Sequence, residues 1–265
     1  MATTTKTVLI TGSTRGIGLA LATTTQRPAG MSLALLVRTA TPTRYDSLSA
    51  TEFPFASKPC CRLFSQQLTA LTPFKVVTMD TSDEASVAKA AAELEGVAID
   101  LVINNAGTGW LMEIVEPTKQ LLMNAVEVNA VGPFLVMRAL QANLQLAAKL
   151  HGAAAVVQIS SLLGSITSNT NENVVFFNGQ YAYSMSKAAL NMITRSLAVN
   201  MRGSNVAVVA VHPGYVDTEL TGGQGPLKPH DVATAIADIV SKVTIKDTGK
   251  FLNADPTMPG VELPW

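Results

Sequence analysis

Two tyrosines and a lysine lie close together in the segment YAYSMSKAAL, residues 181–190. The segment has a helical pattern, and a helix places residues four positions apart on one face. Tyr183 and Lys187 have that spacing, whereas Tyr181 would face Met185, which does no proton chemistry. A neighbouring ammonium lowers the pKa of a tyrosine from its usual value of about 10 toward neutrality. The pair therefore predicts a proton donor, Tyr183, tuned by Lys187; the alternative is packing plus a solvated charge. We expect Tyr181 to be packing or a pocket wall.

A glycine-rich turn follows the first apolar run, in TVLITGSTRGIGLAL, residues 7–21. A glycine at the end of a strand, here Gly12, permits a positive φ and a tight turn. Gly16 and Gly18 at the start of a helix let backbone N–H groups and the helix dipole approach a pyrophosphate. This strand–turn–helix context predicts a dinucleotide site. The alternative is a turn that only lets helix and strand pack closely.

The charge near the expected ribose position distinguishes two cofactors. An acidic residue after the second strand holds the 2′-hydroxyl of NAD, whereas arginine suits the 2′-phosphate of NADP. Here the second strand, SLALLVRTAT, ends in Arg38 and Thr39 with no acid nearby, and Arg15 stands in the glycine turn. We therefore expect NADP(H). The alternative for either arginine, taken alone, is a solvated surface charge.

The elements that must position these residues alternate along the chain. The strand candidates are continuous apolar runs, as expected for strands covered on both faces. The expected strands are Thr7–Thr11, Ser32–Val37, Lys75–Met79, Ile99–Ile103, Ala153–Ser160, Val206–Val211 and Gly249–Asn253. The expected helices are Gly16–Thr25, Asp83–Leu94, Thr118–Leu150, Tyr181–Met201 and Pro229–Val243. This alternation predicts an α/β fold, an open parallel sheet with helices on both faces and ligands at the carboxyl ends of its strands.

One stretch, Thr39–Phe74, fits this alternation poorly because it carries four prolines. A parallel sheet requires a crossover helix between the second and third strands, and CRLFSQQLTAL, residues 61–71, is the best candidate. We expect the rest of the stretch to be a long surface loop.

Composition excludes several classes of protein. The chain has 265 residues, 48% hydrophobic and 14% charged, with nineteen basic and nineteen acidic side chains. A balanced charge without a basic stripe argues against nucleic acid, and the apolar runs are too short to span a bilayer. The only cysteines, Cys60 and Cys61, are adjacent, so neither a disulfide framework nor a metal site is indicated. We expect a soluble cytoplasmic protein without a signal peptide.

Motifs in a fixed order complete the pattern: TGSTRGIG at 11–18, NNAG at 104–107, VNAVGPF at 128–134, SS at 160–161, YSMSK at 183–187 and HPGYVDT at 212–218. With these motifs the chain resembles the short-chain dehydrogenase/reductase family over nearly its whole length. SSLLGSI, YSMSKAALNM and the ending GKFLN…ELPW resemble the sniffer-like and C-factor-like carbonyl reductases. The resemblance implies a single-domain Rossmann fold over residues 1–265, a doubly wound parallel sheet of about seven strands with helices on both faces.

The resemblance also implies an activity. It points to an NADPH-dependent reductase that transfers a hydride to the carbonyl of a small uncharged aldehyde, ketone or quinone. Tyr183 would donate the proton, and Lys187 would tune Tyr183 and hold the nicotinamide ribose. Ser161 would orient the substrate, with Ser160 as the alternative. Asn129 would hold a proton-relay water, or else serve only as a hydrogen-bonding interruption of a helix.

Cofactor contacts are expected from the ends of several strands. The implied residues are Gly12, Ser13, Thr14, Arg15, Gly16, Ile17, Gly18, Arg38, Asp80, Thr81, Asn105, Ala106, Gly107, Tyr183, Lys187, Pro213, Gly214, Val216 and Thr218. Asn105 should also tie neighbouring strands together by side-chain hydrogen bonds. His212 is expected to be structural.

Ser161 and Tyr183 are 22 positions apart, wider than the family's commonest spacing. The extra piece, SITSNTNENVVFFNGQ, is expected to be a loop beside the substrate pocket, with Phe176 and Phe177 as apolar wall. Gly109–Val115 and Glu219–Pro229 should complete that pocket.

Two other functions fit the same residues. One is a non-catalytic NADP-binding redox sensor or regulator, and the other is an alcohol dehydrogenase that works in the oxidative direction. The resemblance also implies a homodimer or homotetramer, paired through the two long helices at Thr118–Leu150 and Tyr181–Met201.

Overall fold

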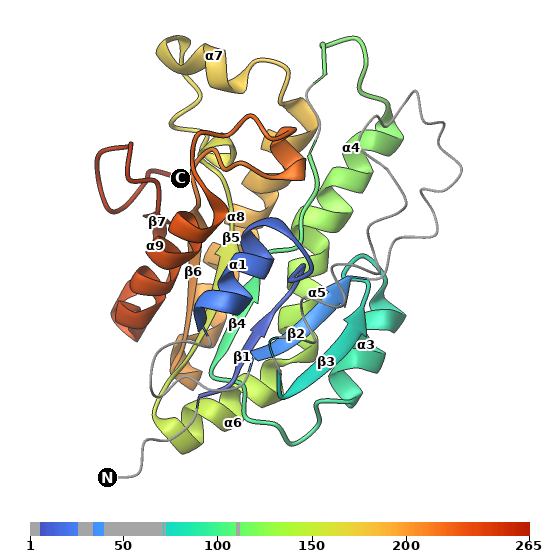
Figure 1. Cartoon of the computed structure of the whole chain (residues 1–265), viewed down its shortest axis with the longest axis vertical. Helices are drawn as coiled ribbons and strands as arrows, with labels where there is room; N and C mark the ends of the chain where they lie inside the picture. The colour runs from blue at the N-terminus through green and yellow to red at the C-terminus, as the bar shows by residue number, and fades with distance from the viewer. Residues whose placement is uncertain (1–5, 26–33, 40–70, 72, 110–111) are drawn as a thin grey trace.

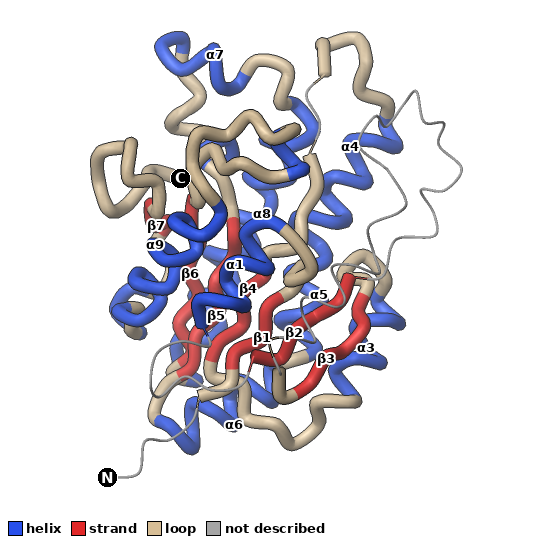
Figure 2. The backbone as a smooth tube through the Cα atoms, viewed as in Figure 1, coloured by secondary structure: helices blue, strands red, loops and turns tan. Residues whose placement is uncertain are grey.

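The computed structural model describes residues 6–25, 34–39 (backbone course only), 71, 73–109 and 112–265. Seven parallel strands form one sheet in the order β3-β2-β1-β4-β5-β6-β7 (Figure 2). The strands are β1 (Val8–Ile10), β2 (Ala34–Thr39), β3 (Lys75–Met79), β4 (Leu101–Asn104), β5 (Ala154–Ile159), β6 (Val206–His212) and β7 (Phe251–Asn253). The predicted parallel α/β fold is confirmed.

The strand order reverses between β1 and β4, which lie side by side with Val8 opposite Leu101 and Ile10 opposite Ile103. From β1 the chain adds β2 and β3 on one side, then returns to add β4 to β7 on the other. A ligand crevice forms outside the carboxyl ends of the strands at such a reversal. Those ends point toward the upper part of Figure 1, where the short helix α7 (Val174–Phe177) lies.

Helices cover both faces of the sheet. On one face α1 (Gly16–Thr25) packs against α9 (Pro229–Lys242), and both lie in front of the strands in Figure 1. On the other face lie α3 (Glu84–Ala92), α5 (Gly132–Ala139), α6 (Gln141–His151) and α8 (Tyr181–Met201). The central strands β1, β4 and β6 are buried throughout, as strands covered on both faces are, whereas β3 at the edge of the sheet is partly exposed.

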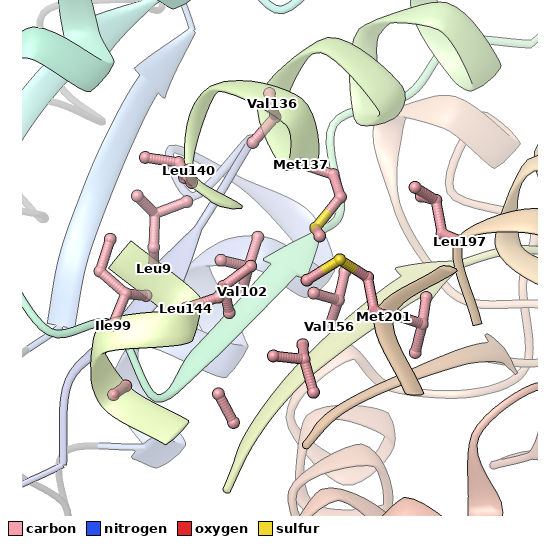
Figure 3. Close-up of a cluster of buried hydrophobic side chains, with 14 of the residues drawn as sticks. Leu9, Ile99, Val102, Val136, Met137, Leu140, Leu144, Val156, Leu197 and Met201 are labelled. Carbon is pink, nitrogen blue, oxygen red and sulfur yellow. The ribbon is translucent and has the colours of Figure 1, made fainter. Parts of the chain in front are cut away.

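The larger core cluster joins the sheet to the second helical layer (Figure 3). Strand side chains on this face meet side chains of α5, α6 and α8, and each buried side chain of this size contributes about 1.5–3 kcal/mol. The labelled members are Leu9, Ile99, Val102, Val136, Met137, Leu140, Leu144, Val156, Leu197 and Met201. This packing fixes α8, the helix with the tyrosine–lysine pair, against the sheet.

The prediction of one continuous helix over Thr118–Leu150 is wrong. The stretch contains α4 (Lys119–Val126), a π-helical turn η2 (Glu127–Val131), α5 and α6. The second break is at Leu140, whose φ of −98° and ψ of 9° leave the helical region. The π turn widens the helix around Asn129, whose side chain bonds to residues outside the helix.

The run 119–139 is, by length and composition, the one helix among the described residues that could cross a membrane. It is partly buried and packs on α8, as core helices of the same composition do. Apolar side chains still face outward here, Met123 and Phe134 on this run and Met192 and Val199 on α8. Pairing of two copies through these helices stays a prediction.

Several predicted elements lie wholly or partly outside the described residues. The crossover helix at 61–71 is described only at Leu71, and Cys60 and Cys61 are not described. Elsewhere boundaries shift by a few residues; Asp83, predicted as the first residue of a helix, is the N-cap of α3. Among the described residues no three His, Cys, Asp or Glu side chains gather as a metal site would require.

Candidate active site

The glycine turn after β1 has the conformation that the sequence predicted. Gly12 has φ of 64° and Gly16 has φ of 54°, which favour glycine. A Cβ on Gly18 would lie 2.2 Å from the carbonyl oxygen of Gly12, so α1 meets the turn without room for a side chain. Because α1 begins at Gly16, the N–H groups of its first turn have no partner within the helix. The cradle fits the pyrophosphate of a dinucleotide.

Asn105 holds the turn in place from the neighbouring strand. Its Nδ2 donates to the carbonyl oxygens of Thr11 (3.1 Å) and Gly12 (3.2 Å). In return Thr11 Oγ1 accepts from the backbone N–H groups of Asn105 (3.0 Å) and Ala106 (3.1 Å). The prediction that Asn105 ties adjacent strands is confirmed, and its side chain positions the cradle rather than standing free in the crevice.

Tyr183 lies in the first turns of α8 with two partners beside it. Ser161 lies beside Tyr183 and its side chain lowers the tyrosine pKa, and Lys187 Nζ lies 5.6 Å from the centroid of the tyrosine ring. Lys187 is buried and its Nζ donates to the carbonyl oxygen of Ile159 at 2.8 Å. Tyr181 points elsewhere and is 42% exposed. The i, i+4 spacing thus selected the tyrosine that lies beside Ser161 and Lys187.

The structure also separates the two serines. Ser160 Oγ donates to Asn191 Oδ1 at 2.6 Å and is buried, so its hydroxyl ties β5 to α8. Ser161 accepts from the backbone N–H of Leu163 (3.2 Å) and faces Tyr183. The geometry therefore favours Ser161, as the sequence had predicted.

The pKa values of the pair follow from burial. Burial raises the pKa of Tyr183 to about 12, against the smaller opposing effect of the Ser161 hydrogen bond. Burial also lowers the pKa of Lys187 to about 8. The prediction that Lys187 lowers the tyrosine pKa is thus wrong for the chain by itself, because removing the phenolate from water costs more than its neighbours return. At neutral pH Tyr183 keeps its proton.

Asn129, in the π turn, serves as a clamp. Its Oδ1 accepts from the N–H of Thr108 (2.8 Å), and its Nδ2 donates to Thr108 O (2.7 Å) and to Ser186 Oγ (2.9 Å). Ser186 Oγ in turn donates to the carbonyl oxygen of Tyr183 at 2.7 Å. Both amide hydrogens are thus used by the protein. A proton-relay water on Asn129 stays a prediction.

Ser186 is the residue that sequence reasoning missed. It is fully buried and joins the π turn to the tyrosine that α8 presents. Its position three residues after Tyr183, on the same helical face, was the available signal.

Gly107 lies between two of these groups. A Cβ there would stand 3.2 Å from Asn129 Oδ1 and 3.7 Å from Lys187 Nζ. The NNAG motif therefore ends in glycine where a side chain would crowd the space between the clamp and the lysine.

The turn after β6 completes the crevice. Buried His212 accepts through Nδ1 from the N–H groups of Leu162 (3.2 Å) and Gly214 (3.4 Å). Burial lowers its pKa to about 4, so it is neutral and structural, as predicted. Gly214 has φ of 87°, which the turn after Pro213 needs. Beyond buried Val216, the side chain of Thr218 packs over Gly16.

Several residues predicted to contact the adenosine half of the cofactor already have partners or close contacts within the protein. Arg15 Nη1 pairs with Glu219 Oε2 at 2.8 Å. Asp80 Oδ1 accepts from the N–H (3.0 Å) and hydroxyl (2.7 Å) of Ser82. Thr81 is buried, with its backbone close against Gly132. For Arg38 only the backbone position in β2 is described, so its contact with a phosphate stays a prediction.

The 165–180 segment is not the plain loop that was expected. It forms a 3-10 turn at Asn171–Asn173 and then α7. Phe177 is buried, but Phe176 is 59% exposed, so only one of the two phenylalanines packs into the fold. The N–H of Met112 donates to Gly179 O at 2.9 Å, which ties this segment to the one after β4.

An open cavity of about 480 Å³ lies at this junction. It is lined by Met112, Glu113, Ile114, Glu116, Asn178, Gly179 and Tyr181. Tyr181 is therefore a pocket wall, one of the two roles expected for it. Trp110 and Leu111, in the predicted 109–115 wall, lie outside the described residues.

A glycine cradle at the reversal of a parallel sheet, with a Ser–Tyr–Lys group beside it, defines a dinucleotide-dependent oxidoreductase site. The family model for short chain dehydrogenase matches residues 57–226. The chain belongs to the short-chain dehydrogenase family, and the predicted resemblance is confirmed.

Individual relatives agree with this assignment. The chain is 30% identical over 185 residues to a 1-hydroxy-2-glutathionyl-2-methyl-3-butene dehydrogenase of Rhodococcus, covering 68% of this chain and 76% of the relative. It is 30% identical over 168 residues to the C-signal protein of Myxococcus xanthus, covering 63% of this chain and 93% of that protein.

Among solved structures, an NADPH-bound carbonyl reductase from chicken fatty liver superimposes with a TM-score of 0.82 at 25% identity, covering 99% of this chain and 95% of that one. The carbonyl reductase Sniffer of Drosophila melanogaster gives a TM-score of 0.81 at 27% identity, covering 98% of this chain and 100% of that one.

Proposed function

We propose that this protein is an NADPH-dependent reductase of small uncharged carbonyl compounds. The observation that carries the proposal is the contact of Ser161 with a protonated Tyr183, beside buried Lys187 and the glycine cradle. Two oriented hydroxyls can both hydrogen-bond one carbonyl oxygen, which is the atom that gains charge when a carbonyl is reduced.

Each residue has a role in this scheme. The cradle Gly12–Gly18, with Arg15, Thr218 and Lys187, would hold the dinucleotide. Bound NADPH would supply the hydride. Ser161 would orient the substrate oxygen and Tyr183 would give it a proton.

NADP is preferred over NAD because Arg15 stands in the cradle and no acid lies near the end of the second strand. The chicken carbonyl reductase with a similar fold is described as NADPH-bound, which supports the same choice.

The raised pKa of Tyr183 bears on the direction of the reaction. Oxidation of an alcohol needs a phenolate base, whereas reduction needs a phenol that can donate. With its pKa raised to about 12, Tyr183 is a donor at neutral pH. Reduction is the proposed direction, and alcohol oxidation by the same residues would require Tyr183 as a phenolate. A redox sensor without turnover is the second candidate, but it leaves the Ser161–Tyr183–Lys187 group without a purpose.

The test is the consumption of NADPH, followed by its absorbance, with a panel of aldehydes, ketones and quinones. We expect turnover with several apolar members of the panel and a clear preference for NADPH over NADH. Tight NADPH binding without turnover of any member would favour the sensor instead.

A further inference from the structure

One segment after β6 is folded as a self-contained unit. Residues 216–228, here called the strap, have paired ends: Val216 lies opposite Leu227, and Asp217 N–H donates to Leu227 O at 2.8 Å. Lys228 Nζ adds an ion pair to Asp217 Oδ2 at 2.8 Å. Inside the strap, Thr221 Oγ1 donates to Val216 O at 2.6 Å. The strap is therefore joined at its base and folded back on itself.

Three consecutive residues of the strap, Thr218, Glu219 and Leu220, cross the ligand crevice. Thr218 precedes the 3-10 turn η6 (Glu219–Thr221), and the other two belong to it. Thr218 Cγ2 lies 3.3 Å from where a Cβ of Gly16 would stand, and Leu220 Cδ1 lies 3.5 Å from the corresponding point on Gly109. Gly16 follows β1 and Gly109 follows β4, so the strap spans the two strands where their order reverses. In Figure 1 it is the orange segment beside the blue glycine turn.

Between these apolar contacts lies an ion pair. Arg15 Nη1 and Glu219 Oε2 are 2.8 Å apart, and the two side chains are 60% and 50% exposed. This pair is a polar contact that joins the strap to the glycine turn. An exposed pair is worth little and exchanges readily with another charged partner. A phosphate is such a partner, because guanidinium binds carboxylate and phosphate with the same geometry.

We propose that Glu219 sets the affinity for the cofactor by competing with its phosphate groups for Arg15. The inference rests on the proposed function, since it takes an NADP-type dinucleotide as the ligand of the glycine turn. Without cofactor, Glu219 neutralises Arg15 and latches the strap over the crevice. A cofactor phosphate then replaces the carboxylate on Arg15 and releases the strap. Glu219 is thus a determinant of affinity and no part of the proton-transfer group.

The variant Glu219→Gln removes the competing charge and keeps the shape of the side chain. We expect it to bind NADPH roughly two- to fivefold more tightly in a calorimetric titration, the range that an exposed ion pair is worth. Asp217→Asn is the matched control: it also removes a negative charge from the strap, but its partner is Lys228. That control should change the NADPH affinity less than Glu219→Gln does.

The Arg15→Ala background separates competition from simple charge repulsion. If Glu219 acts through Arg15, Glu219→Gln should change NADPH affinity hardly at all once Arg15 is absent. Long-range repulsion would instead persist in that background. An undiminished effect there, or an equal gain from Asp217→Asn, would overturn the proposal.

A readout without cofactor tests the latch alone. Amide hydrogen exchange at 219–225 should rise in Glu219→Gln and in Arg15→Ala by the same factor, and no further in the double variant. Unchanged exchange in both single variants would overturn the latch. Failure of the wild-type chain to bind NADPH at all would instead overturn the proposed function and the competitor role, whatever the exchange rates show.

Discussion

The two sides of the ligand crevice are held in different ways. On the β5–α8 side, Ser161, Lys187 and Asn129 are buried and fixed by hydrogen bonds to backbone or to neighbouring side chains. On the β1 side, Arg15 meets the strap through an exposed ion pair. Removing the partner of a buried polar group costs the protein much folding free energy, whereas breaking an exposed ion pair costs it little.

The difference assigns separate tasks to the two sides. The buried side holds donor and acceptor atoms to fixed positions, as proton transfer requires. The exposed side can exchange its partners at small cost, as reversible binding of a charged ligand requires. We therefore expect substitutions on the buried side to have large effects and those on the exposed side small ones.

The largest effect is expected at Tyr183. Tyr183→Phe removes the proton donor and keeps the ring, so kcat for carbonyl reduction should fall about 10³-fold. NADPH affinity in a calorimetric titration should stay near the wild-type value. Tyr181→Phe, two residues away on the cavity wall, is the control and should retain most turnover. An active Tyr183→Phe enzyme would contradict the assigned donor.

Acid should weaken the buried side through His212. Its pKa is lowered to about 4 from 6.5, so the unfolded chain binds more protons between these values. Stability is therefore fully present above about pH 6.5 and is lost as the pH falls to 4. At about 1.4 kcal/mol per pKa unit, the loss from this group is at most about 3 kcal/mol.

Denaturant unfolding at neutral and acidic pH checks this effect. His212→Gln should flatten the dependence on pH, whereas His230→Gln, at an exposed position on α9, should leave it as in the wild type. Equal acid sensitivity in wild type and His212→Gln would show that His212 is not the group responsible.

A smaller effect is expected at Gly107. In Gly107→Ala the methyl group crowds Asn129 Oδ1 and approaches Lys187 Nζ, so kcat should fall about tenfold, or about 1.4 kcal/mol in the barrier. Gly203→Ala is the control, because a Cβ there meets nothing within 4 Å. Full turnover in Gly107→Ala would mean that the space beside Lys187 is not needed.

The smallest effect is expected from the exposed side. Glu219→Gln should change the free energy of unfolding by less than about 1 kcal/mol, as exposed ion pairs generally do. Asp238→Asn, which breaks the exposed pair with Lys242 on α9, should cost a similar small amount. A decrease of several kcal/mol in the free energy of unfolding of Glu219→Gln, without one in Asp238→Asn, would contradict the difference proposed between the two sides.

The sequence predicted the sheet well because its central strands β1, β4 and β6 are buried on both faces and therefore read as uninterrupted apolar runs. It failed over Thr118–Leu150 because helical periodicity continues through the π turn and the break at Leu140. Asn129 bonds Thr108, 21 positions away, and Ser186, 57 positions away. No local pattern reveals such distant partners.

The same limit applies to the site. Spacing alone identified Tyr183 and Lys187, since both lie on one helix. The direction of the Tyr183 pKa shift depends on burial by other segments, so the expectation that nearby Lys187 lowers this pKa had the wrong sign. The Arg15–Glu219 pair joins two loops distant in sequence, so no motif indicated that a predicted phosphate ligand already had a carboxylate partner.

The paired ends of the strap have a consequence for how many changes of length and sequence this loop can tolerate. Because Val216 and Leu227 close the loop at its base, residues can be inserted or exchanged between them with β6 and α9 left in place. Lengthening a loop whose ends are already joined costs little, since the closure entropy grows only slowly with length. The strap can thus be lengthened or exchanged as a unit while the strand before it and the helix after it keep their places.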